Sequence, residues 1–363
     1  MSKYISFRDF DWVQLGIVML ICTVGVLQIY SATFNTKFAG VHVKQIYWIA
    51  AGLILMFVVS LVNYEVLLDN AHWMYLVAVV SLIGVLLVGK KYLGARRWIQ
   101  LPGGAHFQPS EWVKLILVLA IARYFMELRQ RELTWWELVK AGLLVLVPFA
   151  LVLKQPDLGT ALTYLPPLIM GLFLGGMRTK HALVIVVAFS LVAPLAYRQM
   201  KPYQRARLTS FIHPEDDPQG TGYQVEQAKI AVGAGGVLGS GLTHGRQTQG
   251  SFIPEPHNDF IYAAFAEEHG FVGASLLLLL YFLLLMRLIG NAQTAPDRAG
   301  TFIVMGIVAV LAFHVLVNIG MVVGFMPVTG IPLPLMSYGG SSVLFMFLAL
   351  GIVNNVRMRR FVN

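Results

Sequence analysis

The sequence is poor in two residue classes on which soluble proteins depend. It has a single cysteine, Cys22, which excludes an internal disulfide framework and leaves the redox compartment open. Charged residues make up 12% of its 363 residues, whereas 57% are hydrophobic. A soluble globular domain carries roughly 25% charged residues. A chain with half that share cannot cover itself with a water-compatible surface, which indicates that lipid surrounds much of it.

The sequence also lacks the motifs of several function classes. The net charge of +9 comes from basic residues that fall mainly between apolar runs, and no basic stripe interleaved with aromatics suggests a nucleic-acid partner. The glycine-rich run 233–245 lacks the Gly-Lys-Ser/Thr ending of a phosphate loop. No histidine spacing fits a zinc site, and no Ser/His/Asp arrangement is recognisable. The glycine-rich run therefore indicates a flexible or re-entrant turn where backbone packs closely.

Long apolar runs dominate the rest of the chain. A membrane-spanning helix needs about 20 largely apolar residues. The sequence predicts an all-α integral membrane protein, one polytopic domain over residues 1–363, with about ten transmembrane helices. We expect them at 12–32, 43–62, 71–89, 110–127, 136–153, 158–176, 181–197, 259–289, 301–323 and 336–356. A long polar loop, about 198–258, separates the seventh from the eighth.

The distribution of lysine and arginine predicts the orientation. Most basic residues of the short loops fall on the side of the N- and C-termini, which places both termini in the cytoplasm and the long loop outside. Lys90, Lys91, Arg96 and Arg97 lie on the outer side and oppose this bias unless they have a function. The stretch 90–109 mixes these residues with aromatics and glycines, as a segment lying at the membrane interface does.

Ionisable residues gather at the presumed outer ends of several helices. Glu111 and Lys114 lie three apart at the start of the fourth helix and so share a face. Asp157 precedes the sixth helix, and Asp259 opens the eighth. Ionisable groups in or beside membrane helices are costly and usually functional. If these helix ends converge, they make a polar chamber that opens to the outer leaflet.

Each of these residues also has a structural interpretation. Asp157 is suited to cap the N-terminus of a helix. Glu111 and Lys114 suit an ion pair that lets a helix end tolerate lipid. Asp259 suits a first-turn carboxylate that the helix dipole favours. The residues alone do not decide between these interpretations and a catalytic chamber.

Glu267 and Glu268 lie two turns further into the eighth helix. Capping cannot explain carboxylates at that depth. They either line the same chamber or form a buried structural pair with a basic partner.

Ordered motifs between residues 90 and 345 favour a catalytic interpretation of these residues over a structural one. They are FQPSE at 107–111, QPDLGT at 155–160, YQRAR at 203–207, GYQ at 222–224, GAGG at 233–236, NDFI at 258–261 with Glu267 and Glu268, and PLPLMSYGGS at 332–341. Together with the helix count, they resemble the SEDS family (shape, elongation, division and sporulation) of bacterial cell-wall proteins. The short N-terminus before residue 12 resembles the elongation branch of that family.

The resemblance implies a peptidoglycan glycosyltransferase active in cell elongation. Such an enzyme polymerises lipid II, the undecaprenyl-pyrophosphoryl disaccharide-pentapeptide, at the outer face of the bacterial cytoplasmic membrane. Its implied partner is a class B penicillin-binding protein that crosslinks the strands, and membrane lipid surrounds it. The attacking sugar hydroxyl needs a carboxylate base. The leaving pyrophosphate needs positive charge from side chains or a divalent ion.

These requirements assign expected roles to residues. Asp259 is the candidate base, and Lys114, oriented by Glu111, is the candidate contact to substrate. The expected substrate-binding residues are Asp157, Arg205, Arg207, Arg96, Arg97, Trp98, Gln204 and Ser337. A Mg²⁺ or Mn²⁺ ion is expected to bind weakly and to be shared with the substrate, because Asp259, Asp157, Glu111 and the pyrophosphate offer the oxygen ligands that hard cations prefer. No organic cofactor is expected.

Two other function classes fit a charged membrane cavity. A lipid II flippase also needs polar groups inside the membrane. It makes no glycan strands from lipid II, whereas a polymerase does. A non-catalytic scaffold of the elongation machinery has no need for carboxylates clustered at the outer helix ends.

The partner's contact surface is expected on the eighth and ninth helices. Helices associate in lipid through small residues that allow close packing. Gly270, Gly273 and Ala274 offer such a face at the outer end of the eighth helix.

Overall fold

Every apolar segment predicted to span a membrane is helical in the computed structural model, which describes residues 9–92, 95–100, 106–128, 132–212 and 220–360. The helices are α1 (Trp12–Thr33), α2 (Val41–Leu61), α3 (Tyr64–Asp69), α4 (Ala71–Val88), α5 (Pro109–Glu127), α6 (Trp135–Lys154), α7 (Leu158–Leu162), α8 (Leu165–Leu174), α9 (Thr179–Gln199), α10 (Pro202–Ile212), α11 (Thr221–Ala234), α12 (Arg246–Gln249), α13 (Ile261–Gln293), α14 (Arg298–Val322) and α15 (Gly340–Met358). The multi-pass, nearly all-helical architecture is confirmed.

The helices differ in how well they suit a membrane. Among the described residues, seven helices are long and apolar enough to cross one: α1, α2, α6, α9, α13, α14 and α15. α4 is shorter, and the predicted helix 158–176 is divided into α7 and α8. α5 carries four charged residues, Glu111, Lys114, Arg123 and Glu127, so its hydropathy is low for a spanning helix.

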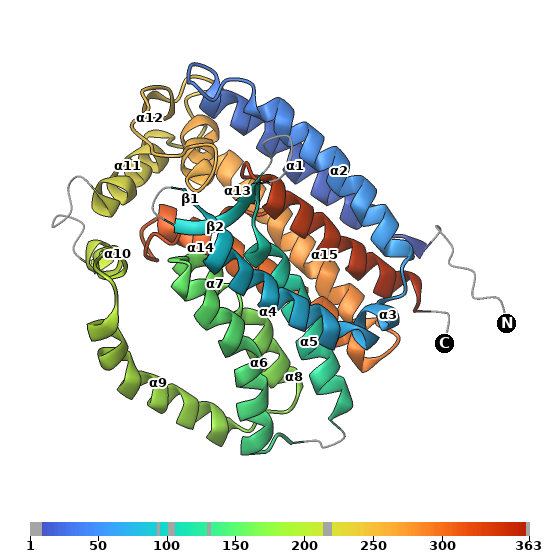
Figure 1. Cartoon of the computed structure of the whole chain (residues 1–363). Coiled ribbons are helices and arrows are strands. Elements are labelled where there is room, and N and C mark those ends of the chain that lie inside the picture. The colour runs from blue at the N-terminus through green and yellow to red at the C-terminus, as the bar shows by residue number, and fades with distance from the viewer. Residues whose placement is uncertain (1–8, 93–94, 101–105, 129–131, 213–219, 361–363) are drawn as a thin grey trace.

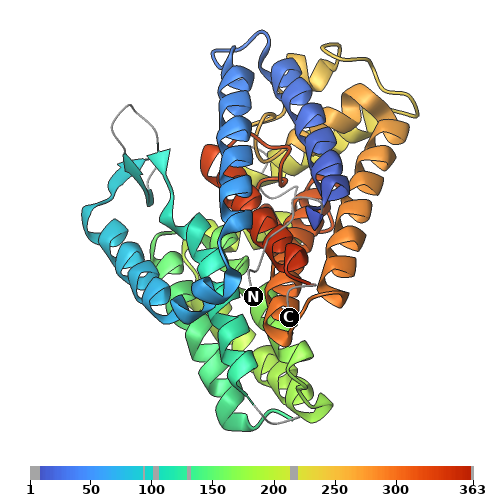
Figure 2. The ribbon, with the colours of Figure 1, turned by 90° about the vertical axis from the view of Figure 1, so that its right-hand side faces the viewer.

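α14 and α15 form the interior of the bundle. They are the most buried of the long apolar helices. α15 packs along α2, and α14 packs against α5, α8 and α13 (Figures 1 and 2). By contrast, α9 arches away from the other helices (Figure 1), and His181 is its only buried residue among those described.

The bundle has two opposite ends. One end carries the last residues of α1 and α14, the first residues of α13 and α15, and the segment 220–257 (Figure 2). We name this end the loop face. The other end carries the start of α1 and the ends of α13 and α15, and we name it the terminal face.

A small antiparallel sheet lies between α4 and α5, in the stretch expected to lie at the membrane interface. Its strands β1 (Lys90–Tyr92), β2 (Ala95–Gln100) and β3 (His106–Phe107) lie in the order β1-β2-β3. Ile99 of β2 pairs with Phe107 of β3. The sheet gives the backbone of Arg97 a fixed place on the loop face.

α13 contains a break at Gly270, whose φ of 63° and ψ of −167° are not helical. The amides of the two residues after the break donate to the carbonyls of Gly236 and Val237, at 2.8 and 3.1 Å. The carbonyls of Glu267 and Glu268 accept from two amides of the same glycine-rich run, at 3.0 and 2.9 Å. Backbone groups freed by the break are thereby satisfied inside the protein, as a membrane environment demands. The predicted close packing of this run is confirmed.

The predicted partner-binding face of small residues is wrong, because this chain itself covers it. A Cβ at Gly270 would collide with the backbone of residues 237–239. Ala274 is buried, and a Cβ at Gly273 would collide with the side chain of His269. These small residues allow the glycine-rich run and the His269 side chain to pack closely around the break in α13.

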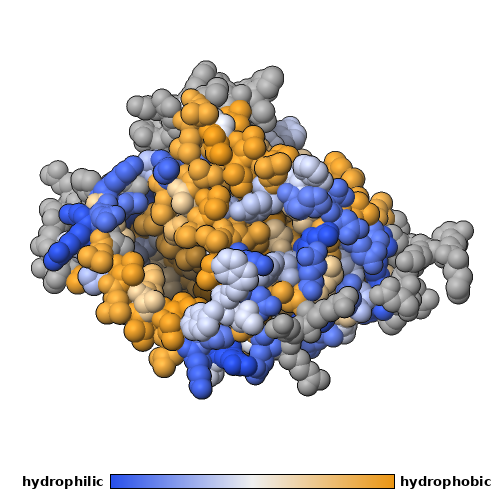
Figure 3. Space-filling model, turned by 60° about the horizontal axis from the view of Figure 1, so that its bottom comes forward, coloured by the Kyte–Doolittle hydropathy of each residue, from blue (hydrophilic) through white to orange (hydrophobic). Residues whose placement is uncertain are grey.

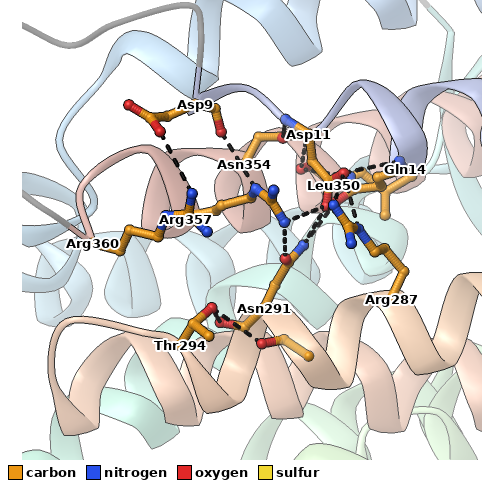
Figure 4. Close-up of polar contacts among 11 residues, drawn as sticks. Asp9, Asp11, Gln14, Arg287, Asn291, Thr294, Leu350, Asn354, Arg357 and Arg360 are labelled. Atoms are coloured by element: carbon orange, nitrogen blue, oxygen red, sulfur yellow. Dashed lines mark hydrogen bonds and ion pairs between the residues drawn. The ribbon is translucent and has the colours of Figure 1, made fainter.

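An ionic cluster joins three helices at the terminal face (Figure 4). Asp11 caps α1 by accepting from the amide of Gln14, and its side chain is fully buried. Arg287 of α13 donates to it through Nε at 2.9 and 3.0 Å, and Arg357 of α15 through Nη1 at 3.1 Å. Asn291 donates at 2.9 Å. Burial raises the pKa of Asp11, but these donors outweigh it and leave the pKa below its ordinary value.

Asp11→Ala should destabilise the protein strongly, because it leaves two arginines facing a void. Removing one partner of a buried ion pair costs about 3–5 kcal/mol. Asp9→Ala is the matched control, since Asp9 pairs with Arg360 at 3.5 Å in a partly exposed position and such pairs contribute about 0–1 kcal/mol. Thermal unfolding in detergent measures both. Equal losses for the two variants would contradict a structural role of the cluster.

Candidate active site

Side chains of two other segments hold the backbone of Asp259 at the loop face. Asp259 lies two residues before α13. The carbonyl of Asn258 accepts from Ser337 Oγ at 2.7 Å. The carbonyl of Asp259 accepts from Asn318 Nδ2 of α14 at 2.9 Å. The place of Asp259 therefore depends on α14 and on the connection 323–339 between α14 and α15.

The Asp259 carboxylate is partly buried and makes no hydrogen bond or ion pair with the described residues. Gly330, at φ +72°, faces it so closely that an added Cβ would lie 3.3 Å from Oδ2. Burial, aided by the negative charges of Glu255 and Asp157, raises the pKa of Asp259 to about 6, and Arg207 and Arg97 oppose this rise. Such a carboxylate is suited to take a proton near neutral pH.

Arg97 and Asp157 face each other beside this carboxylate. Arg97 Nη1 lies 3.7 Å from Asp157 Oδ1, and its other nitrogens donate to the carbonyls of Gln155 and Pro156. Asp157 also caps α7 by accepting from the amide of Thr160 at 3.2 Å. The capping interpretation is confirmed, and the same carboxylate additionally holds an arginine on the loop face.

Arg207 reaches the site from α10. Its Nη1 donates to the carbonyl of Thr329 at 3.1 Å, next to Gly330. Its positive charge acts on Asp259. The structure thus brings together Asp259, Asp157, Arg97 and Arg207, which come from four separate parts of the sequence.

Glu111 and Lys114 form the predicted ion pair, extended by a histidine. Lys114 is fully buried, with Nζ 2.9 Å from Glu111 Oε2 and 3.2 Å from His314 Nε2. Because an ammonium group only donates, His314 Nε2 accepts and the ring proton is on Nδ1. That proton is directed at the carbonyl of Pro332, 3.3 Å away. Sequence reasoning missed His314, since a lone histidine in an apolar helix has no motif around it.

Two predicted substrate-binding residues are used locally and do not reach Asp259. Arg205 Nε donates to the carbonyl of Tyr197 at 3.1 Å, and the guanidinium lies over the Tyr197 ring. Gln204 accepts from the amide of Lys201 at 3.0 Å at the start of α10. Both side chains are turned toward the junction of α9 and α10.

The remaining predicted residues have varied positions. Ser337 is buried, and besides donating to Asn258 it accepts from the amide of Leu333 at 2.8 Å. It therefore holds backbone in place. Trp98 lies on β2 beside Arg97, opposite Lys90. The side chain of Arg96 lies outside the described residues.

Glu267 and Glu268 are structural, but the predicted basic partner is wrong. Glu267 accepts from two backbone amides of residues 247–248 and from Thr248 Oγ1 at 2.7 Å. Glu268 accepts from Ser31 Oγ at 2.6 Å and from Gln28 Nε2 at 3.1 Å. Neutral donors from α1 and α12 satisfy both carboxylates, and no described basic residue pairs with them.

The carboxylates offer little to a metal ion. The described residues contain no group of three or more His, Cys, Asp or Glu side chains that could hold one. Asp157 is engaged by Thr160, Arg97 and Gln108, the last at 3.2 Å. Asp259 has a carboxylate free to ligate, which does not amount to a metal site built by the protein.

An open depression of about 380 Å³ lies beside the segment that leads into Asp259. Its walls are the loop after α1 and residues 248–257. Lys37, Phe38, Glu255 and His257 are among the side chains that line it, and the Phe38 and His257 rings lie 4.9 Å apart. The depression offers amide, hydroxyl, aromatic and charged groups within one space.

Comparison with known proteins identifies the family. Residues 11–361 match the profile of the cell cycle protein family FtsW/RodA/SpoVE. The chain belongs to the FtsW/RodA/SpoVE family. This confirms the resemblance to the SEDS proteins, over almost the whole chain.

Relatives within this FtsW/RodA/SpoVE family have an assigned activity. The peptidoglycan glycosyltransferase MrdB of Escherichia coli K12 is 38% identical over 358 residues, covering 96% of this chain and 95% of the relative. The peptidoglycan glycosyltransferase RodA of Treponema pallidum is 31% identical and is covered to 98%. These names support the elongation branch and an enzyme.

Solved structures of the family share the fold. A chain of a peptidoglycan synthase complex that coordinates polymerisation with crosslinking superimposes with a TM-score of 0.84, at 33% identity, covering 97% of this chain and 98% of the other. RodA of Thermus thermophilus superimposes with a TM-score of 0.72, at 31% identity and the same coverage.

Proposed function

We infer that this chain is a peptidoglycan glycosyltransferase that polymerises lipid II at the outer face of the bacterial cytoplasmic membrane, with both termini in the cytoplasm. Family membership supports the reaction. The observation that carries the assignment of the site is the Asp259 carboxylate, which is partly buried, free of partners among the described residues and flanked by the charges of two arginines.

Asp259 acts as the general base. The hydroxyl of one saccharide attacks the anomeric carbon of another, so a new C–O bond forms while the bond from that carbon to the pyrophosphate breaks. The hydroxyl proton passes to the Asp259 carboxylate. A base whose pKa is about 6 is deprotonated at neutral pH and still accepts a proton readily.

Arg97 and Arg207 stabilise the departing pyrophosphate. Negative charge grows on the bridging oxygen as the bond breaks, and guanidinium groups form strong bidentate bonds with phosphate. Both arginines act electrostatically on Asp259, so the site sets cationic groups beside the base. Lys114 is enclosed by Glu111, His314 and the Phe345 ring, which favours a role in supporting the chamber wall.

The polyprenyl tail lies alongside α9, and the saccharide headgroup enters from the loop face. α9 leads to α10, which carries Arg207, and its side chains are almost all exposed and apolar. In Figure 3, apolar side chains cover the middle of the face that has come forward, and hydrophilic side chains gather at its margins. The depression beside His257 gives the headgroup room next to the base.

A class B penicillin-binding protein is the proposed partner, and the peptidoglycan synthase complex among the solved neighbours supports it. After the break, α13 has an exposed apolar flank that includes Leu276, Leu279, Phe282, Leu283 and Met286. The partner's membrane helix would pack there.

Asp259→Asn should abolish polymerisation while leaving folding intact. Loss of a general base typically costs about 10²–10⁴ in rate. The assay is glycan-strand synthesis from lipid II by the purified protein in detergent. Asp69→Asn, at an exposed carboxylate that pairs with Arg123, is the control and should be fully active. Strands made at the wild-type rate by Asp259→Asn would reject the base, and a wild type that makes none would favour a flippase.

The same residue sets the pH dependence of the rate. The base is active when deprotonated, so activity should be full above pH 7 and fall as pH decreases through about 6, the pKa to which burial raises Asp259. A free carboxylate would place this decline near pH 4. A rate that is flat down to pH 5 would contradict the buried base.

A divalent cation, if it assists, must be held mainly by the pyrophosphate of the substrate, because Asp157 is already engaged. We therefore expect chelation to lower the rate without lowering the unfolding temperature of the free protein. Undiminished synthesis after thorough chelation would exclude a cation. A lowered unfolding temperature would indicate a site built by the protein.

Leu276→Trp on α13 should weaken co-purification with the penicillin-binding protein, because the larger side chain prevents close packing of two helices. Leu76→Trp on α4 is the control, since Leu76 is exposed to a similar degree, 51% against 57%. Equal recovery of the partner with both variants would show that it binds elsewhere.

A further inference from the structure

Asn318 makes two hydrogen bonds that converge on the site. It lies in the interior of α14 and is fully buried. Its Nδ2 donates to the carbonyl of Asp259 at 2.9 Å and to the carbonyl of Ile331 at 2.8 Å. Both hydrogens of the amide group are thereby used, and the two carbonyls fix which way the amide faces.

The first bond helps to fix the position of the Asp259 carboxylate. That carboxylate has no hydrogen bond or ion pair of its own with the described residues, so only its backbone holds it. The backbone is held at successive carbonyls, by Ser337 at Asn258 and by Asn318 at Asp259. Of these two holders, Asn318 belongs to the rigid interior helix, whereas Ser337 belongs to a loop.

The second bond, from Asn318 to the carbonyl of Ile331, holds the segment 329–331, which lies against the Asp259 carboxylate. Ile331 follows Gly330, which approaches the carboxylate, and Thr329, whose carbonyl accepts from Arg207. One amide therefore ties the base and the segment that holds a cationic group to the same point on α14. A change there would alter both the position of the base and its distance to Arg207.

We propose that Asn318 is a positioning residue of the glycosyltransferase. It holds the Asp259 carboxylate and the segment 329–331, which binds Arg207, at the relative positions that the reaction needs. This rests on the proposed function of Asp259 as base. Asn318 itself touches no reacting atom. Misplacement of a reacting group by about 1 Å can cost about 10²-fold in rate.

The decisive variant is Asn318→Leu, which keeps similar volume and cannot donate. It should lower kcat about 10²-fold with KM changed less than about threefold. The released carboxylate becomes more exposed, and exposure lowers its pKa. The acid limb of the pH–rate profile, the part where the rate falls as pH decreases, should therefore move from about pH 6 toward lower pH. Glu255, Asp157, Arg207 and Arg97 are the charged groups that face it, and none of them is substituted in this variant.

Asn355→Leu is the matched control. Asn355 is also a buried asparagine on an interior helix, and its Nδ2 donates to the carbonyl of Ser60 at 2.6 Å near the terminal face. It should lower the unfolding temperature as Asn318→Leu does, while kcat per folded protein and the acid limb stay at wild-type values. Asn318→Gln, which keeps both donors on a longer arm, should recover part of the lost kcat.

The outcomes separate the two claims. If Asp259→Asn is inactive and Asn318→Leu keeps wild-type kcat and acid limb, the positioning role is overturned and the base stands. If Asp259→Asn is active, the base and the positioning role both fall. Should Asn318→Leu not fold, Asn318→Ala is measured in its place, and the same kcat and acid limb decide.

Discussion

The organisation of the loop face depends on the cost of keeping one unpaired carboxylate partly buried. A buried charge without partners is strongly unfavourable. Five other acidic side chains are buried in the described part of the chain, at Asp11, Glu111, Asp157, Glu267 and Glu268, and each has donors. Asp259 differs from all of them. Its backbone is anchored to α14 and to the connection after it, which keeps the carboxylate in place although nothing described binds it.

The two ends of the bundle differ in how their charged side chains are paired. At the terminal face, Asp11 with Arg287 and Arg357 joins α1, α13 and α15 through several charge-assisted hydrogen bonds, which favours a fixed arrangement. At the loop face, the break at Gly270 and the glycine-rich run exchange backbone hydrogen bonds, and Glu267 anchors residues 247–248. This frame leaves the Asp259 carboxylate available to a ligand, with the charges of Arg97 and Arg207 acting on it.

The sequence predicts the helices well and the site in part. Apolar runs of spanning length locate the seven described helices that are long and apolar enough to cross a membrane, because lipid demands such runs of a spanning helix. The motifs contain Asp259, Asp157 and Arg207, and the outer basic residues include Arg97. The structure brings these four residues together. Their partners come from distant positions, so no local pattern reveals His314, Asn318 or the donors around Glu267 and Glu268. Arg205 shares a motif with Arg207, but the direction of a side chain on a helix depends on packing that spacing alone does not show.

The most direct measurement is a structure of the protein with a non-hydrolysable lipid II analogue. The acceptor hydroxyl should lie within hydrogen-bond distance of the Asp259 carboxylate, with the pyrophosphate against Arg97 and Arg207 and the prenyl chain beside α9. A headgroup bound away from Asp259, with the carboxylate facing empty solvent, would contradict the assignment of this residue as the base.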